Sequence, residues 1–173
     1  MALIKKVKGI APKIGKNCFL ADNATVVGDV VMGDDCSIWF NAVVRGDVHS
    51  IRIGRNVNIQ DGAIIHCTYK KAPVVIGDNV SIAHNAIVHG CRIESNVLVG
   101  MGAILMDDVY VESNSLIAAG ALVSKGTRIK SGEVWAGVPA KKIKDIDAAL
   151  LEGEVNRISS SYNMYAGWYE EEK

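Results

Sequence analysis

The stretch IGDNVSIAHNAIVHG, residues 76–90, places an aliphatic residue at every sixth position, at Ile76, Ile82 and Val88. Neither an α-helix nor an alternating β-strand has a six-residue period, whereas short strands that meet at regular corners do. Three such hexads close one triangular coil, and each strand can pair with the strand of the next coil. The period therefore predicts a parallel β-helix whose interior is filled by the periodic aliphatic side chains.

The same period extends over most of the chain. About twenty hexads predict six to seven coils between residues 10 and 137, with one inward residue in each: Ile14, Leu20, Val26, Met32, Ile38, Val44, Ile53, Ile59, Ile65, Ile76, Ile82, Val88, Ile93, Val99, Leu105, Val111, Ile117, Val123, Ile129 and Trp135. Insertions interrupt the period around residues 47–51 and 69–73, and we expect both to loop out. Loops on a rigid scaffold commonly carry function, and these two flank histidines.

After Gly137 the period changes to a helical one. Apolar residues recur at helical spacing at Ile143, Ile146, Leu150 and Val155. This pattern predicts an amphipathic helix that packs along the outside of the solenoid and that a glycine at 153 could interrupt. We therefore expect a single all-β domain with a β-helix over residues 1–137 and a C-terminal helical extension over residues 138–173.

Composition and charge exclude several classes of protein. The chain of 173 residues is 49% hydrophobic and carries 19 basic and 19 acidic side chains, so its formal net charge is zero. A nucleic-acid-binding surface is typically basic. No apolar run approaches the ~18 residues of a membrane-spanning helix, and residues 1–10 lack the apolar core of a secretion signal. Four cysteines without a CxxC pair fit a reducing compartment. We expect a cytoplasmic protein with neither nucleic-acid nor membrane partners.

Three of the four histidines fall at related positions of the repeat. His66 and His89 each follow an inward aliphatic residue by one position, three hexads apart, so they stack on one face at ~4.8 Å. His84 follows Ile82 by two positions and lies on the preceding face. Three solenoids around a threefold axis would bring the His84 of one subunit to the His66 and His89 of its neighbour. Three imidazoles with an open fourth position are typical of a catalytic zinc site. His49, in an inserted loop, is expected at the surface.

Other polar residues share the geometry of the histidines. Arg45 follows Val44 by one position, which places it on the face of His66 one coil earlier. A cation beside a metal needs a carboxylate partner, which would be Asp47 or its copy across the subunit interface. Asp61 has the offset of His84 one coil earlier, and Gln60 precedes it. We interpret these residues as surroundings that orient the ligands of a metal.

Three motifs resemble the γ-class carbonic anhydrases and their bacterial relatives: RGD at 45–47, NIQDGAIIH at 58–66 and IAHNAIVHG at 82–90. The resemblance runs through nearly the whole chain and includes GVPAKKI and the C-terminal helix. It implies a left-handed β-helix that forms a homotrimer and reversibly hydrates CO2 to bicarbonate. The implied cofactor is Zn²⁺, although imidazole ligands suit Fe²⁺ and Co²⁺ as well.

The resemblance also implies roles for individual residues. His66 and His89 of one subunit and His84 of its neighbour would hold the metal. Arg45 and Asp47 match an intersubunit salt bridge of the family. Gln60 and Asp61 match residues that orient the solvent at the metal. Tyr162, in SYNMYAGWY, matches a tyrosine that approaches the site.

The sequence departs from the family in the loops beside the metal. Well-studied members carry glutamates there, whereas Val48 follows RGD and the loop after His66 reads CTYKKAP, without an acid. This departure predicts weak activity with slow proton release, in which His49 could act as a buffer. Two alternatives stay open, an acyltransferase on the same fold and a metal-binding scaffold with weak, thioesterase-like hydrolase activity.

Overall fold

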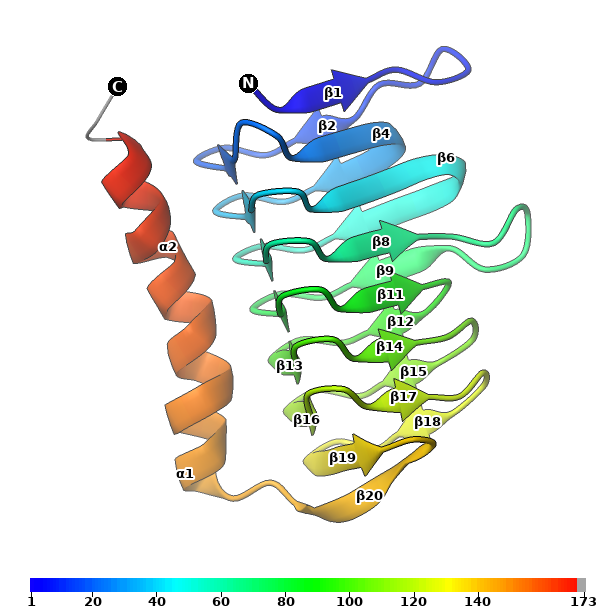
Figure 1. The fold of residues 1–173 in the computed structure, drawn as a ribbon, viewed down its shortest axis with the longest axis vertical. Coiled ribbons are helices and arrows are strands. Elements are labelled where there is room, and N and C mark those ends of the chain that lie inside the picture. Colours follow the sequence, from blue (N-terminus) through cyan, green and yellow to red (C-terminus); the bar gives the residue numbers. More distant parts are fainter. Residues whose placement is uncertain (171–173) are drawn as a thin grey trace.

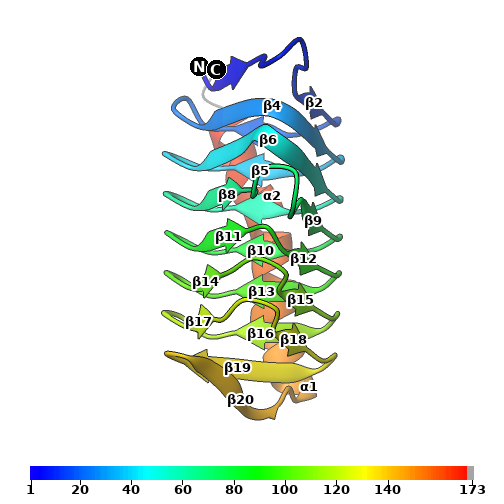
Figure 2. The same ribbon diagram turned by 90° about the vertical axis from the view of Figure 1, so that its right-hand side faces the viewer.

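The six-residue repeats form short strands that stack into triangular coils, as the computed structural model shows for the described residues 1–170 (Figure 1). Strands of neighbouring coils pair in parallel, so each coil adds one strand to each of three faces. The predicted parallel β-helix is confirmed. Figure 2 shows the coils stacked in register, with the C-terminal helix behind them.

Each face is a column of paired strands. The first, called here the histidine face, contains β1 (Leu3–Lys5), the first halves of β4 (Thr25–Met32) and β6 (Val43–Ile53), β8 (Ile64–His66), β11 (Ile87–His89), β14 (Ile104–Leu105) and β17 (Leu122–Val123). The second contains β2 (Lys13–Ile14), the second halves of β4 and β6, β9 (Val74–Ile76), β12 (Arg92–Ile93), β15 (Tyr110–Val111) and β18 (Arg128–Ile129). The third contains β3 (Phe19–Leu20), β5 (Ser37–Ile38), β7 (Asn58–Ile59), β10 (Ser81–Ile82), β13 (Val97–Val99), β16 (Ser115–Ile117) and β19 (Glu133–Gly137).

The periodic aliphatic residues form the core. Each is at most 6% exposed, except for Ile14, Leu20 and Trp135 at the two ends of the solenoid. Asparagine or aspartate occupies the left-handed backbone conformation at successive corners, for example Asn79 with φ 55° and Asn96 with φ 58°. These residues tolerate that conformation better than most others. They also connect the coils, since the Nδ2 of Asn79 donates to the Oδ1 of Asn96 at 3.1 Å.

The two insertions have different structures. Residues 47–51 were expected to loop out, but they lie within β6, which runs unbroken from Val43 to Ile53 and pairs with β4 across a register shift. The register with β4 runs from Gly46 directly to Ile51, so the residues between them bulge at the corner without a register partner in the neighbouring strands. Residues 69–73 do leave the coil, as a tight turn closed by the bridge between Thr68 and Ala72.

The C-terminal segment begins with a strand where helical spacing predicted a helix. β20 (Ala140–Asp145) pairs antiparallel with β19 and covers the last coil, so Ile143 is in a strand and 59% exposed. Helical structure begins with α1 (Ala148–Leu150), where Asp147 accepts a hydrogen bond from the backbone N–H of Leu150 at 2.8 Å. It continues through wider π turns, η1 (Leu151–Asn156), and α2 (Arg157–Glu170).

The helix returns along the third face toward the N-terminal coils (Figure 1). Aromatic contacts hold it there, with the rings of Trp39 and Tyr162 5.1 Å apart and those of Phe19 and Tyr169 5.3 Å apart. No helix among the described residues is long and apolar enough to cross a membrane. This placement brings the tyrosines of α2 to the corner that follows β10.

Candidate metal centre

Two histidines lie one above the other on adjacent coils of the histidine face. His66 ends β8, His89 ends β11, and the two are partners in the parallel register. The Nδ1 of His66 lies 3.2 Å from the Nε2 of His89. Two nitrogen ligands of tetrahedral zinc, each ~2.0–2.1 Å from the ion, lie about 3.3 Å apart. The spacing of this pair therefore suits a shared metal ion.

The other ring nitrogen of His89 contacts Asp107. The Nδ1 of His89 is 2.6 Å from the Oδ1 of Asp107, whose Oδ2 accepts a hydrogen bond from the Thr68 hydroxyl at 2.6 Å. Burial alone would raise the pKa of Asp107, but hydrogen bonds from Thr68 and His89 more than offset this and hold it below its usual value. An ionised carboxylate only accepts, so the Nδ1–H donates to it and the Nε2 is left as the metal-facing lone pair.

His66 has a corresponding carboxylate in Asp47. The Nε2 of His66 lies 3.2 Å from the Oδ1 of Asp47, and the Oδ2 of Asp47 accepts from Arg45 at 2.7 Å. Burial, followed by the nearby Arg45 cation, lowers the pKa of His66 below its ordinary value. A neutral imidazole is the form that binds a metal. Arg45 and Asp47 pair within one chain here, and the Arg45 side chain is 44% exposed.

His84 lies at the corner after β10 and has its own carboxylate and tyrosine. Its Nδ1 is 2.9 Å from the Oδ2 of Asp61, and its Nε2 is 3.4 Å from the hydroxyl of Tyr162 on α2. Burial raises the pKa of Tyr162 to about 12, so its hydroxyl stays protonated at neutral pH and can donate. Asp61 and Tyr162 were both singled out in the sequence, and the structure brings them to the same imidazole.

A cavity of about 380 Å³ opens between the helix and the third face, beside His84. Its walls include Gln60 and Tyr162 together with mainly apolar side chains such as Leu98 and Ile158. Gln60 is 3% exposed, and its Nε2 donates to the Oδ1 of Asn58 at 2.9 Å. That bond holds the side-chain amide of Gln60 at the cavity wall and leaves its oxygen as an acceptor.

His49 differs from the other histidines and, although it was expected in a loop at the surface, lies within β6 and is only partly exposed. Its Nδ1 accepts a hydrogen bond from the backbone N–H of Ser50 at 2.8 Å, and its ring has no carboxylate partner among the described residues. It is half-buried in a different cavity of about 380 Å³, whose wall it shares with Asp47 and Lys70. Asp47 therefore lies between this cavity and His66.

The structure brings two of the three candidate metal-ligating histidines together within one chain. Within residues 1–170, no three His, Cys, Asp or Glu side chains gather so that they could hold a metal ion. His66 and His89 do fit a metal, since they are adjacent and each directs one ring nitrogen at a carboxylate and the other at its partner ring. Among the described residues, His84 does not join this pair; its ring contacts Asp61 and Tyr162 instead.

Asp107 is a site residue that sequence reasoning missed. The motifs that indicated ligand partners lie around residues 45–47 and 58–61. Asp107 lies one coil beyond His89, just after β14, the strand paired with β11. Its signal in the sequence is an acid two positions after the inward Leu105. The loop CTYKKAP contains no acid, but its Thr68 binds Asp107, so a carboxylate does lie beside this loop.

Comparison with known proteins identifies the family. The family model described as bacterial transferase hexapeptide (six repeats) matches residues 11–46 and 90–125. The chain is 44% identical over 160 residues to gamma carbonic anhydrase 2, mitochondrial, of Arabidopsis thaliana, with 90% of this chain and 56% of that protein covered. It thus spans just over half the length of that relative.

Two further proteins match over nearly their whole length. A carbonic anhydrase of Geobacillus kaustophilus is 38% identical over 160 residues, which cover 92% of this chain and 87% of that protein. The crystal structure of a hexapeptide transferase family protein from Anaplasma phagocytophilum superposes with a TM-score of 0.92 at 36% identity, covering 96% of this chain and 98% of that one. The chain belongs to the γ-class carbonic anhydrase family of hexapeptide-repeat proteins.

Proposed function

We propose that this protein is a metal-dependent carbonic anhydrase that reversibly hydrates CO2 to bicarbonate at sites shared between the subunits of a homotrimer. One observation carries the proposal: within the described part of the chain, three of the four histidines have a carboxylate at one ring nitrogen, and the fourth does not. Carboxylates in this position fix the tautomer of metal-ligating histidines and raise their basicity. The exception, His49, is also the histidine that no metal-site motif includes.

The positions of these histidines support the proposed trimer. His66 and His89 share the histidine face, whereas His84 is at the corner after β10, against α2. A threefold arrangement would place the His84 corner of one subunit against the His66–His89 pair of the next and form three equal sites. Zn²⁺ is the first candidate, and Fe²⁺ or Co²⁺ suits the same donors.

The bound metal would supply Lewis acidity, which makes hydroxide available from water near neutral pH. The surrounding side chains would hold and orient the reactants. Asp107 and Asp47 keep their imidazoles in one tautomer, and Asp61 does the same for His84. Gln60, held by Asn58, offers an amide oxygen to accept from water, and Tyr162 offers a hydroxyl donor. The apolar lining of the adjacent cavity suits an uncharged substrate.

Proton release is the step for which this chain is least equipped. Val48 and the CTYKKAP loop supply no acid, and Asp107, which does reach the loop, is occupied by His89 and Thr68. His49 shares a cavity wall with Asp47, the carboxylate on His66, so its imidazole is the candidate to carry the proton away. We expect modest turnover that depends on external buffer. We also expect the protein to act in the cytoplasm, although the Arabidopsis relative is named as mitochondrial.

Acyl transfer is a second candidate, because the cavity beside His84 is larger than one CO2 molecule needs and because one matched structure is named a hexapeptide transferase family protein. In that reaction His84 alone would act as the base, positioned by Asp61, while the His66–His89 pair would be unnecessary. Hydrolysis of a thioester in the same cavity would use the same base.

Metal analysis combined with activity assays distinguishes these candidates. Protein purified without oxygen should contain one zinc, iron or cobalt ion per chain, and stopped-flow measurements should detect CO2 hydration. His89→Ala should abolish both, whereas His49→Ala should retain the metal. The second candidate would instead be established by two results together. The protein would show no CO2 hydration, and it would transfer or hydrolyse the acetyl group of acetyl-coenzyme A in an activity that His89→Ala retains and His84→Ala loses.

A further inference from the structure

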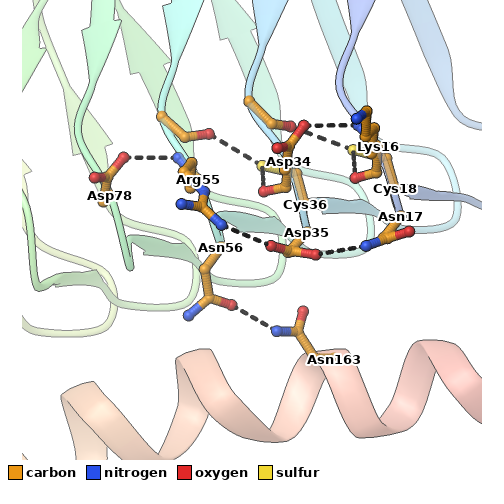
Figure 3. A network of polar contacts seen from close by, with 12 residues as sticks. Lys16, Asn17, Cys18, Asp34, Asp35, Cys36, Arg55, Asn56, Asp78 and Asn163 are labelled. Carbon is orange, nitrogen blue, oxygen red and sulfur yellow. Dashed lines mark hydrogen bonds and ion pairs between the residues drawn. The ribbon is translucent and has the colours of Figure 1, made fainter.

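Two cysteines face each other across adjacent coils, at the corner where the third face begins. Cys18 precedes β3 and Cys36 precedes β5, and the residues that follow them, Phe19 and Ser37, are register partners. The backbone N–H of Phe19 donates to the carbonyl of Cys36 at 2.9 Å. Neighbouring strands lie ~4.8 Å apart, within the ~4.4–6.8 Å between Cα atoms that a disulfide spans. Figure 3 shows both sulfurs on the same side of the stacked corners.

The two thiols have different chemical environments. The nearby Cys36 thiol lowers the pKa of Cys18 to about 7, against burial and the carboxylates of Asp34 and Asp35, which raise it, while the Cys18 S–H lies 3.3 Å from the carbonyl of Gly33. Cys18 and burial raise the pKa of Cys36, whose S–H donates to the carbonyl of Gly54 at 3.1 Å. Lys16, beside Cys18, binds the Asp34 carboxylate through its backbone N–H at 2.8 Å. Cys18 is therefore the more readily ionised and more nucleophilic thiol of the pair.

Cys18 is the accessible member of the pair. It is half-buried, in the first complete coil, whereas Cys36 is 1% exposed and lies on the wall of a cavity of about 310 Å³. The helix side of this cavity consists of the uncharged residues Asn163, Ala166 and Gly167. Cys67 and Cys91 are also buried, and burial raises the pKa of each, to about 11 for Cys67. Reactivity should therefore concentrate on Cys18.

We propose that Cys18 and Cys36 form a thiol-modification site that reacts with low-molecular-weight disulfides and closes to a reversible disulfide between the first two coils. The Cys18 thiolate attacks one sulfur of the reagent, the reagent's S–S bond breaks, and one thiolate leaves and takes up a proton. Cys36 then loses its proton, attacks the Cys18 sulfur and releases the second thiol. Two protein thiols are oxidised and one reagent disulfide is reduced.

This site is separate from the histidines and concerns the N-terminal coils. The same corner contacts the helix, because the Nδ2 of Asn163 donates to the Oδ1 of Asn56 at 2.8 Å (Figure 3). A disulfide at this position would join the first coil covalently to the second beneath the last turns of α2. The oxidised protein would therefore keep its N-terminal coils closed under conditions that open them in the reduced protein.

Oxidised glutathione and mass spectrometry test the site. The treated wild-type chain should lose two hydrogen atoms, and cleavage before aspartates, which separates the cysteines, should yield one linked pair of peptides containing Cys18 and Cys36. Cys36→Ser should instead retain one glutathione on Cys18, because no second thiol displaces it. Cys67→Ser, the matched control, should behave as the wild type. Oxidation that spares Cys18, or that links it to another cysteine, would overturn the proposal.

Alkylation of the untreated wild-type protein gives a second readout that needs no variant. A thiol with a pKa of about 7 is half ionised at pH 7, against about 1% for a pKa of 9.0, which is about 50-fold more thiolate. Lower basicity reduces nucleophilicity about eightfold over two pH units. Cys18 should therefore react with iodoacetamide about sixfold faster than an ordinary thiol at pH 7, with a midpoint near that pH. A midpoint near 9, or faster alkylation of Cys67, would contradict the assignment of Cys18 as the nucleophile.

Discussion

Mixing two inactive variants should restore a predictable fraction of the metal sites. In the proposed trimer, His84→Ala removes the ligand that a subunit contributes to its neighbour's site. His66→Ala removes a ligand of the site on the subunit's own histidine face. Each variant alone should bind no metal at high affinity, since every site keeps two imidazoles at most. In a mixed trimer, a site is intact when the subunit that supplies the His66–His89 pair retains His66 and the neighbour that completes the site retains His84. For random mixing of equal amounts this occurs at about one half times one half, or one quarter, of the interfaces.

The metal bound per chain and the CO2 hydration rate measure this restoration. The variants should be coexpressed, or mixed after dissociation, and loaded with Co²⁺, whose absorption spectrum reports its ligands directly. His66→Ala mixed with His89→Ala is the control, because these ligands come from the same chain and no pairing can restore both. That mixture should regain no sites. Equal recovery in both mixtures, or none in either, would refute the shared site, and full metal binding by His84→Ala alone would place the site within one chain.

Further substitutions test the surroundings of the site. Asp107→Asn should weaken zinc binding about 10–100-fold in competition with a chelating dye, and the same change at its exposed neighbour Asp108 should not. His49→Ala should lower turnover up to ~100-fold in dilute buffer, with recovery in concentrated imidazole buffer. Asp47→Ala should promote trimer dissociation, measured by sedimentation. The free energy of association should weaken by ~0.2–1 kcal/mol if the Arg45–Asp47 pair stays half-exposed in the trimer, and by ~3–5 kcal/mol if the trimer buries it. Because the pKa of His66 is lowered on folding, the metal-free fold should lose stability as pH falls below about 6.5, an effect that His66→Gln should remove in urea unfolding.

The repeat and the histidine stack could be predicted from the sequence because both depend on counting. A six-residue period assigns each residue a face and a coil, so the pairing of His66 with His89 and of Arg45 with His66 follows from their offsets. The contact of His84 with Asp61 follows in the same way. Tyr162 was identified by resemblance, because the path of a helix outside the repeat cannot be counted.

The features that the sequence did not predict lie where the six-residue period stops, or where a tertiary interaction overrides the local sequence pattern. The strand β20 contains Ile143 at helical spacing, but the last coil presents an open strand edge, and pairing with it satisfies backbone groups that a helix would leave exposed. Residues 47–51 stay within β6 because the strand pairs on both sides of the bulge that they form. Asp107 was missed because its importance comes from two hydrogen bonds to distant residues, His89 and Thr68.

The antiparallel return of the helix ties the length of the helix to the number of coils. Tyr162 meets His84 because the chain leaves the solenoid after the last coil and runs back over several coils before reaching that level. An extra coil after residue 97 would move the start of the helix ~4.8 Å further away, which about three more helical residues at 1.5 Å each would restore. An extra coil between His66 and His89 has no such remedy, because it would separate the two rings by a second strand spacing. Relatives with longer or shorter solenoids should therefore vary in the coils after His89 and compensate in the helix.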